Sequence, residues 1–199
     1  KNAGNIKKLF VINKPSKEYI EIKLGNKFKN LLELTYKDVT VQSDNFEKLA
    51  QNCTKLERLC VQNCYNSEGC ILTHIDVVTL EKMKSLKCLE IYFLRNFIES
   101  SYIDEILQKL KLQTLKINDV RYLTNTEANI ECGVDRTESL SESYPCEELV
   151  LGRLSDVKID TCITSLLTYM KNLQIFHFNS FALETGENVL SDIITQTLQ

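Results

Sequence analysis

The chain has 199 residues, with 24 lysines and arginines against 27 aspartates and glutamates, and its net charge is -3 at pH 7. A general binder of nucleic acid would carry a strong positive excess, so the charge excludes that class of protein. Hydrophobic residues make up 43% of the chain, which is too many for a disordered protein. No apolar run reaches the roughly 18 residues that cross a bilayer. We therefore expect a globular protein with no nucleic-acid or membrane partner.

One spacing of apolar residues, Leu-x-x-Leu-x-Leu-x-x-Cys, recurs along the chain. Its clearest copy is in residues 56–64, and the seven copies start 25, 25, 30, 26, 34 and 27 residues apart. The alternation of apolar and polar residues inside each copy predicts a short β-strand. In chain order, the paired apolar positions of these strands are Leu9 and Val11, Leu34 and Tyr36, Leu59 and Val61, Leu89 and Ile91, Leu115 and Ile117, Leu149 and Leu151, and Phe176 and Phe178.

A second apolar spacing, at positions i, i+3, i+4 and i+7, precedes several of these strands. It is complete in residues 46–53, 103–110 and 163–170, and partial copies occupy 77–80 and 190–194. Apolar residues at these intervals lie on one face of a helix. The sequence therefore predicts a helix before the third, fourth, fifth and seventh strands, and a further apolar helix at the end of the chain.

The two spacings together predict a repeat architecture. A single strand–helix unit cannot bury its apolar face, so several units must stack. We expect an α/β fold, a curved solenoid of about seven repeats with a parallel sheet on its concave side and helices on its convex side. We expect one domain over residues 1–199. Because neither end carries a polar capping repeat, we expect that the chain is a fragment of a longer one.

Residues 49–64, LAQNCTKLERLCVQNC, resemble the cysteine-containing leucine-rich repeats of F-box leucine-rich-repeat proteins. In the other copies, the last position of the pattern departs from cysteine or asparagine. That position is occupied by Lys14, Val39, Leu94, Val120, Leu154 and Phe181. By analogy, the resemblance implies the substrate-recognition part of an F-box type ubiquitin ligase adaptor, which would contact the ligase complex through a region outside this chain.

Two features interrupt the regular pattern. Residues 121–145 lengthen one repeat and lack the helical spacing, so they form either a tolerated insertion or a loop that contacts a partner. Charge is also uneven, because residues 1–50 carry ten lysines against six acidic residues, whereas residues 101–150 carry five basic and ten acidic residues. Such a gradient either orients a charged partner or is simply a solvated surface.

No pattern in the sequence indicates catalysis, a cofactor or a metal site. The two histidines, His74 and His177, have no neighbouring nucleophile, and there is no glycine-rich phosphate loop. We expect His177 to be exposed on its strand. The protein is therefore not expected to be an enzyme.

The eight cysteines leave three possibilities: free thiols, disulfides and a zinc site. The repeat explains much of the set as buried apolar residues, since Cys53 falls on the helix face and Cys64 and Cys146 fall at pattern positions. Cys60 and Cys88 are expected to face outward from their strands. We expect free thiols in a reducing compartment, cytoplasmic or nuclear.

Alternate strand positions point away from the helices and form the predicted concave face. This face mixes charged residues with a few aromatic ones, which suits protein recognition. The alternatives are that partners use the helices or the 121–145 loop. We predict that a protein partner binds the concave face through Lys37, Arg58, Gln62, Glu90, Tyr92, Phe93, Arg95, Lys116, Asn118 and His177.

The expected function is that of a protein–protein interaction scaffold. Two other functions remain open, a structural subunit or assembly factor of a larger complex and a ligand-sensing receptor domain. The receptor alternative would call for disulfide caps and several glycosylation sites. Within the proposed face, Tyr92, Phe93 and Arg95 lie in the most aromatic stretch, so their replacement is expected to weaken partner binding.

Overall fold

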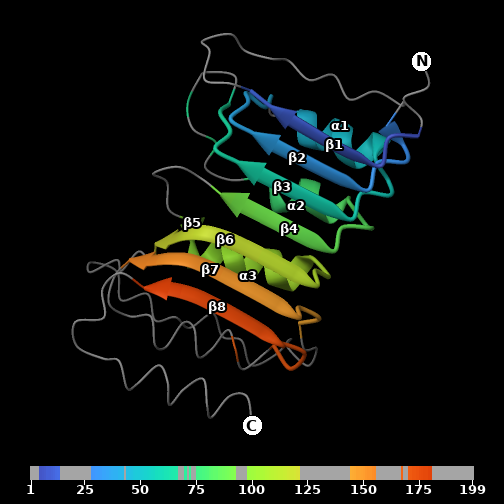
Figure 1. The fold of residues 1–199 in the computed structure, drawn as a ribbon. Helices are drawn as coiled ribbons and strands as arrows, with labels where there is room; N and C mark the ends of the chain where they lie inside the picture. Colours follow the sequence, from blue (N-terminus) through green and yellow to red (C-terminus); the bar gives the residue numbers. More distant parts are fainter. Residues whose placement is uncertain are drawn as a thin grey trace.

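The computed structural model describes residues 5–13, 28–42, 44–66, 70, 72, 75–92, 98–121, 144–155, 167 and 170–180. These residues form an α/β fold with a single sheet, in which parallel strands lie side by side in chain order (Figure 1). The strands along the sheet are β1 (Lys8–Ile12), β2 (Glu33–Lys37), β3 (Arg58–Gln62), β4 (Cys88–Tyr92), β6 (Thr114–Arg121), β7 (Glu148–Ser155) and β8 (Ile175–Ser180). A two-residue strand, β5 (Ile98–Glu99), pairs with the end of β6.

The register of the sheet aligns equivalent positions of the apolar repeat. Leu59 on β3 pairs with Leu34 on β2 and with Leu89 on β4. The same row continues through Leu115 to Leu149. A register shift between Leu151 and Arg153 is the one irregularity among the described strand pairs. The prediction of a parallel strand at each of the seven copies is confirmed.

Three described helices lie on the same side of the sheet (Figure 1). They are α1 (Asn45–Asn52), α2 (Val77–Glu81) and α3 (Ser100–Lys109). The short helix α2 begins at a good capping residue, because the Asp76 carboxylate accepts hydrogen bonds from the backbone N–H groups of Val78 and Thr79 at 3.3 and 3.0 Å. These helices confirm the predictions at residues 46–53, 77–80 and 103–110.

The core lies between the helices and the sheet. From β2 to β7, the paired apolar side chains that face the helices are buried, as are Leu49 of α1, Leu80 of α2 and Ile106 of α3. On the outer strands, Leu9 and Val11 of β1 and Phe176 of β8 are partly buried. Full burial of a leucine or isoleucine stabilises the fold by about 1.5–3 kcal/mol. The apolar stripe of each helix therefore covers the apolar face of the strands, which is why the two spacings advance together along the sequence.

The chain turns in the same way after two neighbouring strands. Asp38 follows β2 with a φ of 56°, and Asn63 follows β3 with a φ of 51°. Asparagine and aspartate tolerate this left-handed conformation better than most residues. Each then donates its backbone N–H to the next strand, Asp38 to Gln62 and Asn63 to Tyr92.

Some predictions fall outside the described residues. These include most of the 121–145 segment and the apolar helix expected at 190–194. Of the quartet in 163–170, Leu167 and Met170 are described, and both belong to the core.

Candidate interaction surface

The face of the sheet opposite the helices is named here the open face. Because the strands are parallel and in register, its side chains form rows that run across the sheet. The first row is Lys8, Glu33, Arg58, Cys88, Thr114, Glu148 and Ile175. The second row is Phe10, Thr35, Cys60, Glu90, Lys116, Val150 and His177. The third row begins with Ile12, Lys37, Gln62 and Tyr92.

Glu90 is the centre of a polar cluster on this face. Its carboxylate accepts hydrogen bonds from the Arg58 guanidinium at 3.4 Å and from the Tyr92 hydroxyl at 3.3 Å. The Cys88 thiol lies 3.6 Å from the same carboxylate. The Glu90 side chain is 16% exposed, whereas that of Arg58 is 53% exposed. Three of the predicted binding residues are thus brought together, with arginine outermost.

Cys60 and Cys88 lie on the open face as predicted, but they are not exposed. Their exposed fractions are 9% and 7%. Burial, as the largest cause, raises the pKa of the Cys60 thiol to about 11 and that of Cys88 to about 12. Sequence alternation gives the direction in which a side chain points, but not whether longer neighbours cover it. These thiols are therefore structural and poorly nucleophilic.

A second polar cluster joins β6 and β7. The Lys116 ammonium lies 2.7 Å from the Glu148 carboxylate, which also accepts a hydrogen bond from the Thr114 hydroxyl at 3.3 Å. The hydrogen bond from Lys116 lowers the pKa of the Glu148 carboxyl and raises the pKa of Lys116. Lys8 and Glu33 form a similar pair at 2.8 Å between β1 and β2. Glu33, Glu90 and Glu148, the carboxylates in the described rows of the open face, are therefore each matched by a cation on a neighbouring strand.

The other predicted binding residues are placed less centrally. In the third row Gln62 pairs with Tyr92 and Lys37 pairs with Gln62, and His177 is exposed on β8, two strands away from Lys116. Asn118 belongs to β6, but its side chain is not described. Phe93 and Arg95 lie outside the described residues.

Large exposed apolar side chains lie toward both ends of the open face. Phe10 is 61% exposed and Ile12 58% on β1, and Ile175 is 45% exposed on β8. The predicted binding set omitted all three, although their outward strand positions were readable from the alternation. Exposed aromatic and aliphatic side chains beside charged ones are typical of protein-binding surfaces.

The described residues contain no group of three or more histidine, cysteine, aspartate or glutamate side chains that could hold a metal ion. Cys53, Cys60, Cys64, Cys70, Cys88 and Cys146 are free thiols. Within the same part of the chain, no helix has both the length and the apolar character needed to span a membrane. Comparisons with models of known protein families and with curated proteins find no match.

Proposed function

We propose that this protein is a protein–protein interaction scaffold that binds its partner on the open face. The observation that carries the proposal is the division of the sheet into two faces. The apolar positions of the repeat point to the helices, while charged, aromatic and exposed aliphatic side chains line the other face across all seven parallel strands. No described helix covers that second face, so a partner can approach it.

The scaffold that we propose is a leucine-rich-repeat solenoid. The regular register of the strands supports this proposal, and so does the residue pair after β3. Asn63 adopts the left-handed turn conformation, and the buried Cys64 thiol hydrogen-bonds the Gln62 carbonyl oxygen at 3.4 Å. Asn63 thus makes the turn that follows β3, and the Cys64 side chain is buried in the core beside it. These two residues belong to the segment that carries the resemblance, and each has a physical role.

The charges of the open face favour a partner with acidic side chains. The described strands present Lys8, Lys37, Arg58 and Lys116 against Glu33, Glu90 and Glu148. The three carboxylates are paired, and Lys37 is in no ion pair with a described residue. A partner surface with a carboxylate near an apolar side chain would complement Lys37 and the exposed Ile12, which is its neighbour in the same row.

The narrower proposal is that the scaffold selects substrates for an F-box type ubiquitin ligase. The similarity of residues 49–64 to the repeats of F-box leucine-rich-repeat proteins supports it. A repeat fold alone does not fix a function, so this step depends on recovery of the ligase itself.

Quantitative affinity purification with matched variants tests both proposals. Lys37→Glu and Phe10→Ser alter the open face, whereas Lys84→Glu and Val78→Ser are comparable changes at exposed positions on α2 and in the turn after it. The scaffold proposal predicts one set of proteins that is lost with the first two variants and retained with the second two. The scaffold proposal is contradicted if both pairs of variants lose these proteins equally, or if neither pair loses any of them. The narrower proposal further predicts a cullin among the proteins recovered with the full-length protein, and its absence contradicts that step alone.

A further inference from the structure

We propose that the hollow at the amino ends of β1, β2 and β3 binds a phosphate group. The hollow has a volume of about 350 Å³ and is lined by Asn5, Lys7, Asn30, Leu32 and Lys55. It lies at an edge of the sheet, apart from the clusters around Glu90 and Glu148. The proposal therefore does not depend on the proposed function of the open face.

The repeat itself builds this hollow. Asn5, Asn30 and Lys55 are successive positions at intervals of 25 residues, each just before a strand. Lys7 and Leu32 are a second pair at the same interval, immediately preceding β1 and β2. Parallel strands in register bring such equivalent positions side by side.

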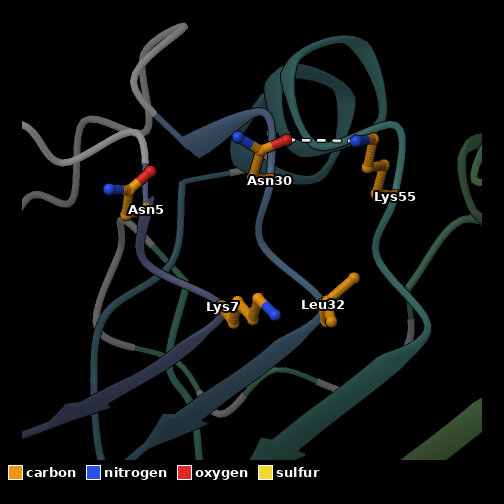
Figure 2. A pocket seen from close by; sticks show the side chains of 5 residues that line it. All are labelled: Asn5, Lys7, Asn30, Leu32 and Lys55. Carbon is orange, nitrogen blue, oxygen red and sulfur yellow. Dashed lines mark hydrogen bonds between the residues drawn. The ribbon is translucent and has the colours of Figure 1, made fainter.

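Figure 2 shows how the polar groups are arranged around the hollow. The Lys7 ammonium turns toward Leu32, across the gap from Lys55. The Lys55 ammonium donates a hydrogen bond to the Asn30 side-chain oxygen at 3.1 Å, which fixes the orientation of that amide. Two lysines and two asparagines thus line one hollow, with the Lys55 ammonium directed at Asn30.

The electrostatics of the lining favour an anion. None of the five lining residues is acidic, and neither lysine forms an ion pair with a described residue. The nearby Glu57 carboxylate is instead paired with Lys87, 3.4 Å away. Two positive charges with amide donors suit a doubly charged tetrahedral oxyanion, because each phosphate oxygen accepts several hydrogen bonds.

Nuclear magnetic resonance titration of the full chain with inorganic phosphate tests the proposal. Ionic strength is held constant with chloride, so that general screening does not change. We expect saturable shifts of the backbone amides of residues 5–7, 30–32 and 55, with a dissociation constant of about 1–10 mM. The absence of saturable shifts at these residues overturns the proposal.

Charge-neutralising variants identify the residues responsible. Lys7→Gln and Lys55→Gln should each weaken phosphate binding about three- to fivefold, and the double variant should abolish the shifts. Lys84→Gln removes the same charge from an exposed lysine outside the hollow and should leave the affinity unchanged. Unchanged binding in the double variant, or equal weakening by Lys84→Gln, overturns the site.

A parallel titration with phosphoserine distinguishes the source of the phosphate group. Tighter binding of phosphoserine than of inorganic phosphate, with the same shifted amides and the same loss in the double variant, assigns the hollow to a phosphorylated side chain. Equal affinities assign it to free phosphate. Failure of both ligands to bind overturns the proposal without affecting the open face.

Discussion

The hydroxyl group of Tyr102 on α3 bridges both backbone groups of Ile75, which lies just before α2. It accepts a hydrogen bond from the Ile75 N–H at 3.0 Å and donates one to the carbonyl oxygen of the same residue. Backbone groups in a connection have no strand or helix partner of their own, so a side chain must satisfy them when they are buried. Tyr102 therefore ties α3 to the start of the preceding helix.

Replacement of Tyr102 by phenylalanine is expected to lower the free energy of unfolding by about 1–3 kcal/mol, because both Ile75 groups lose their partner. Tyr36→Phe is the matched control. The Tyr36 hydroxyl is buried without a hydrogen-bond partner among the described residues, so its removal should be neutral or stabilising. Urea denaturation of the two variants measures the difference. Equal losses of stability would contradict this account of Tyr102.

The aligned row of leucines should dominate stability. Leu89→Ala removes a fully buried side chain that pairs with Leu59 and Leu115, and it is expected to cost about 2–5 kcal/mol. Phe10→Ala removes a larger side chain that is 61% exposed, and its cost should stay below about 0.5 kcal/mol. Thermal and chemical denaturation compare the two. A larger loss for Phe10→Ala would show that the wrong face has been placed inside.

Cysteine reactivity should follow burial. Cys70 is exposed, whereas Cys53, Cys60, Cys64, Cys88 and Cys146 are buried free thiols. Among these six thiols, an alkylating reagent should modify Cys70 first in the native protein, and the five buried ones should react only on unfolding, because burial disfavours the thiolate. Mass spectrometry locates the label at each site. Rapid labelling of Cys60 or Cys88 in the native protein would contradict the burial of these thiols by neighbouring side chains on the open face.

Stability should fall at alkaline pH. Burial raises the pKa of the Cys64 thiol from its ordinary value of 9.0 to about 12 in the folded protein. Below pH 9 this thiol is protonated in both states, so it adds no pH dependence; above pH 9 the unfolded chain releases a proton that the folded protein retains. The free energy of unfolding should therefore decrease as pH rises from 9, by up to about 1.4 kcal/mol per pH unit for each such thiol.

Cys64→Ala isolates the contribution of one thiol. The variant is destabilised at all pH values by the loss of a buried side chain, but its stability should decline less steeply above pH 9 than that of the unmodified protein. Denaturant midpoints measured along an alkaline pH series give both slopes. Identical slopes would rule out a buried, neutral thiol at this position.

The strands could be predicted from the sequence because their apolar residues are tied to one physical requirement, burial against the helices. Leu59 and Val61 occupy positions that any packed parallel strand must make apolar, and the regular spacing of the copies fixed which of them would pair. The covered state of Cys60 was not predictable in this way. It depends on the reach of the side chains around it on neighbouring strands, and alternation contains no information about that reach.

The candidate site was predicted in part for the same reason. Arg58, Glu90 and Tyr92 were assigned to one face by alternation, and in the structure Arg58 and Tyr92 each lie within hydrogen-bond distance of Glu90. The sequence could not indicate that the Glu90 carboxylate would accept a hydrogen bond from both Arg58 and Tyr92. The contact with Arg58 depends on the register between β3 and β4. The hollow beside Lys7 and Lys55 was also missed. The interval of 25 residues between Asn5, Asn30 and Lys55 was the signal that could have found it.

The parallel, in-register sheet is the claim on which both the open face and the hollow depend, and interstrand nuclear Overhauser effects test it most directly. We predict amide contacts that place Leu89 between Leu59 and Leu115, and Leu149 next to Leu115, without strong α-proton to α-proton contacts between neighbouring strands. Strong α-proton to α-proton contacts, which mark antiparallel pairs, or contacts that join these leucines in another order, would contradict the account.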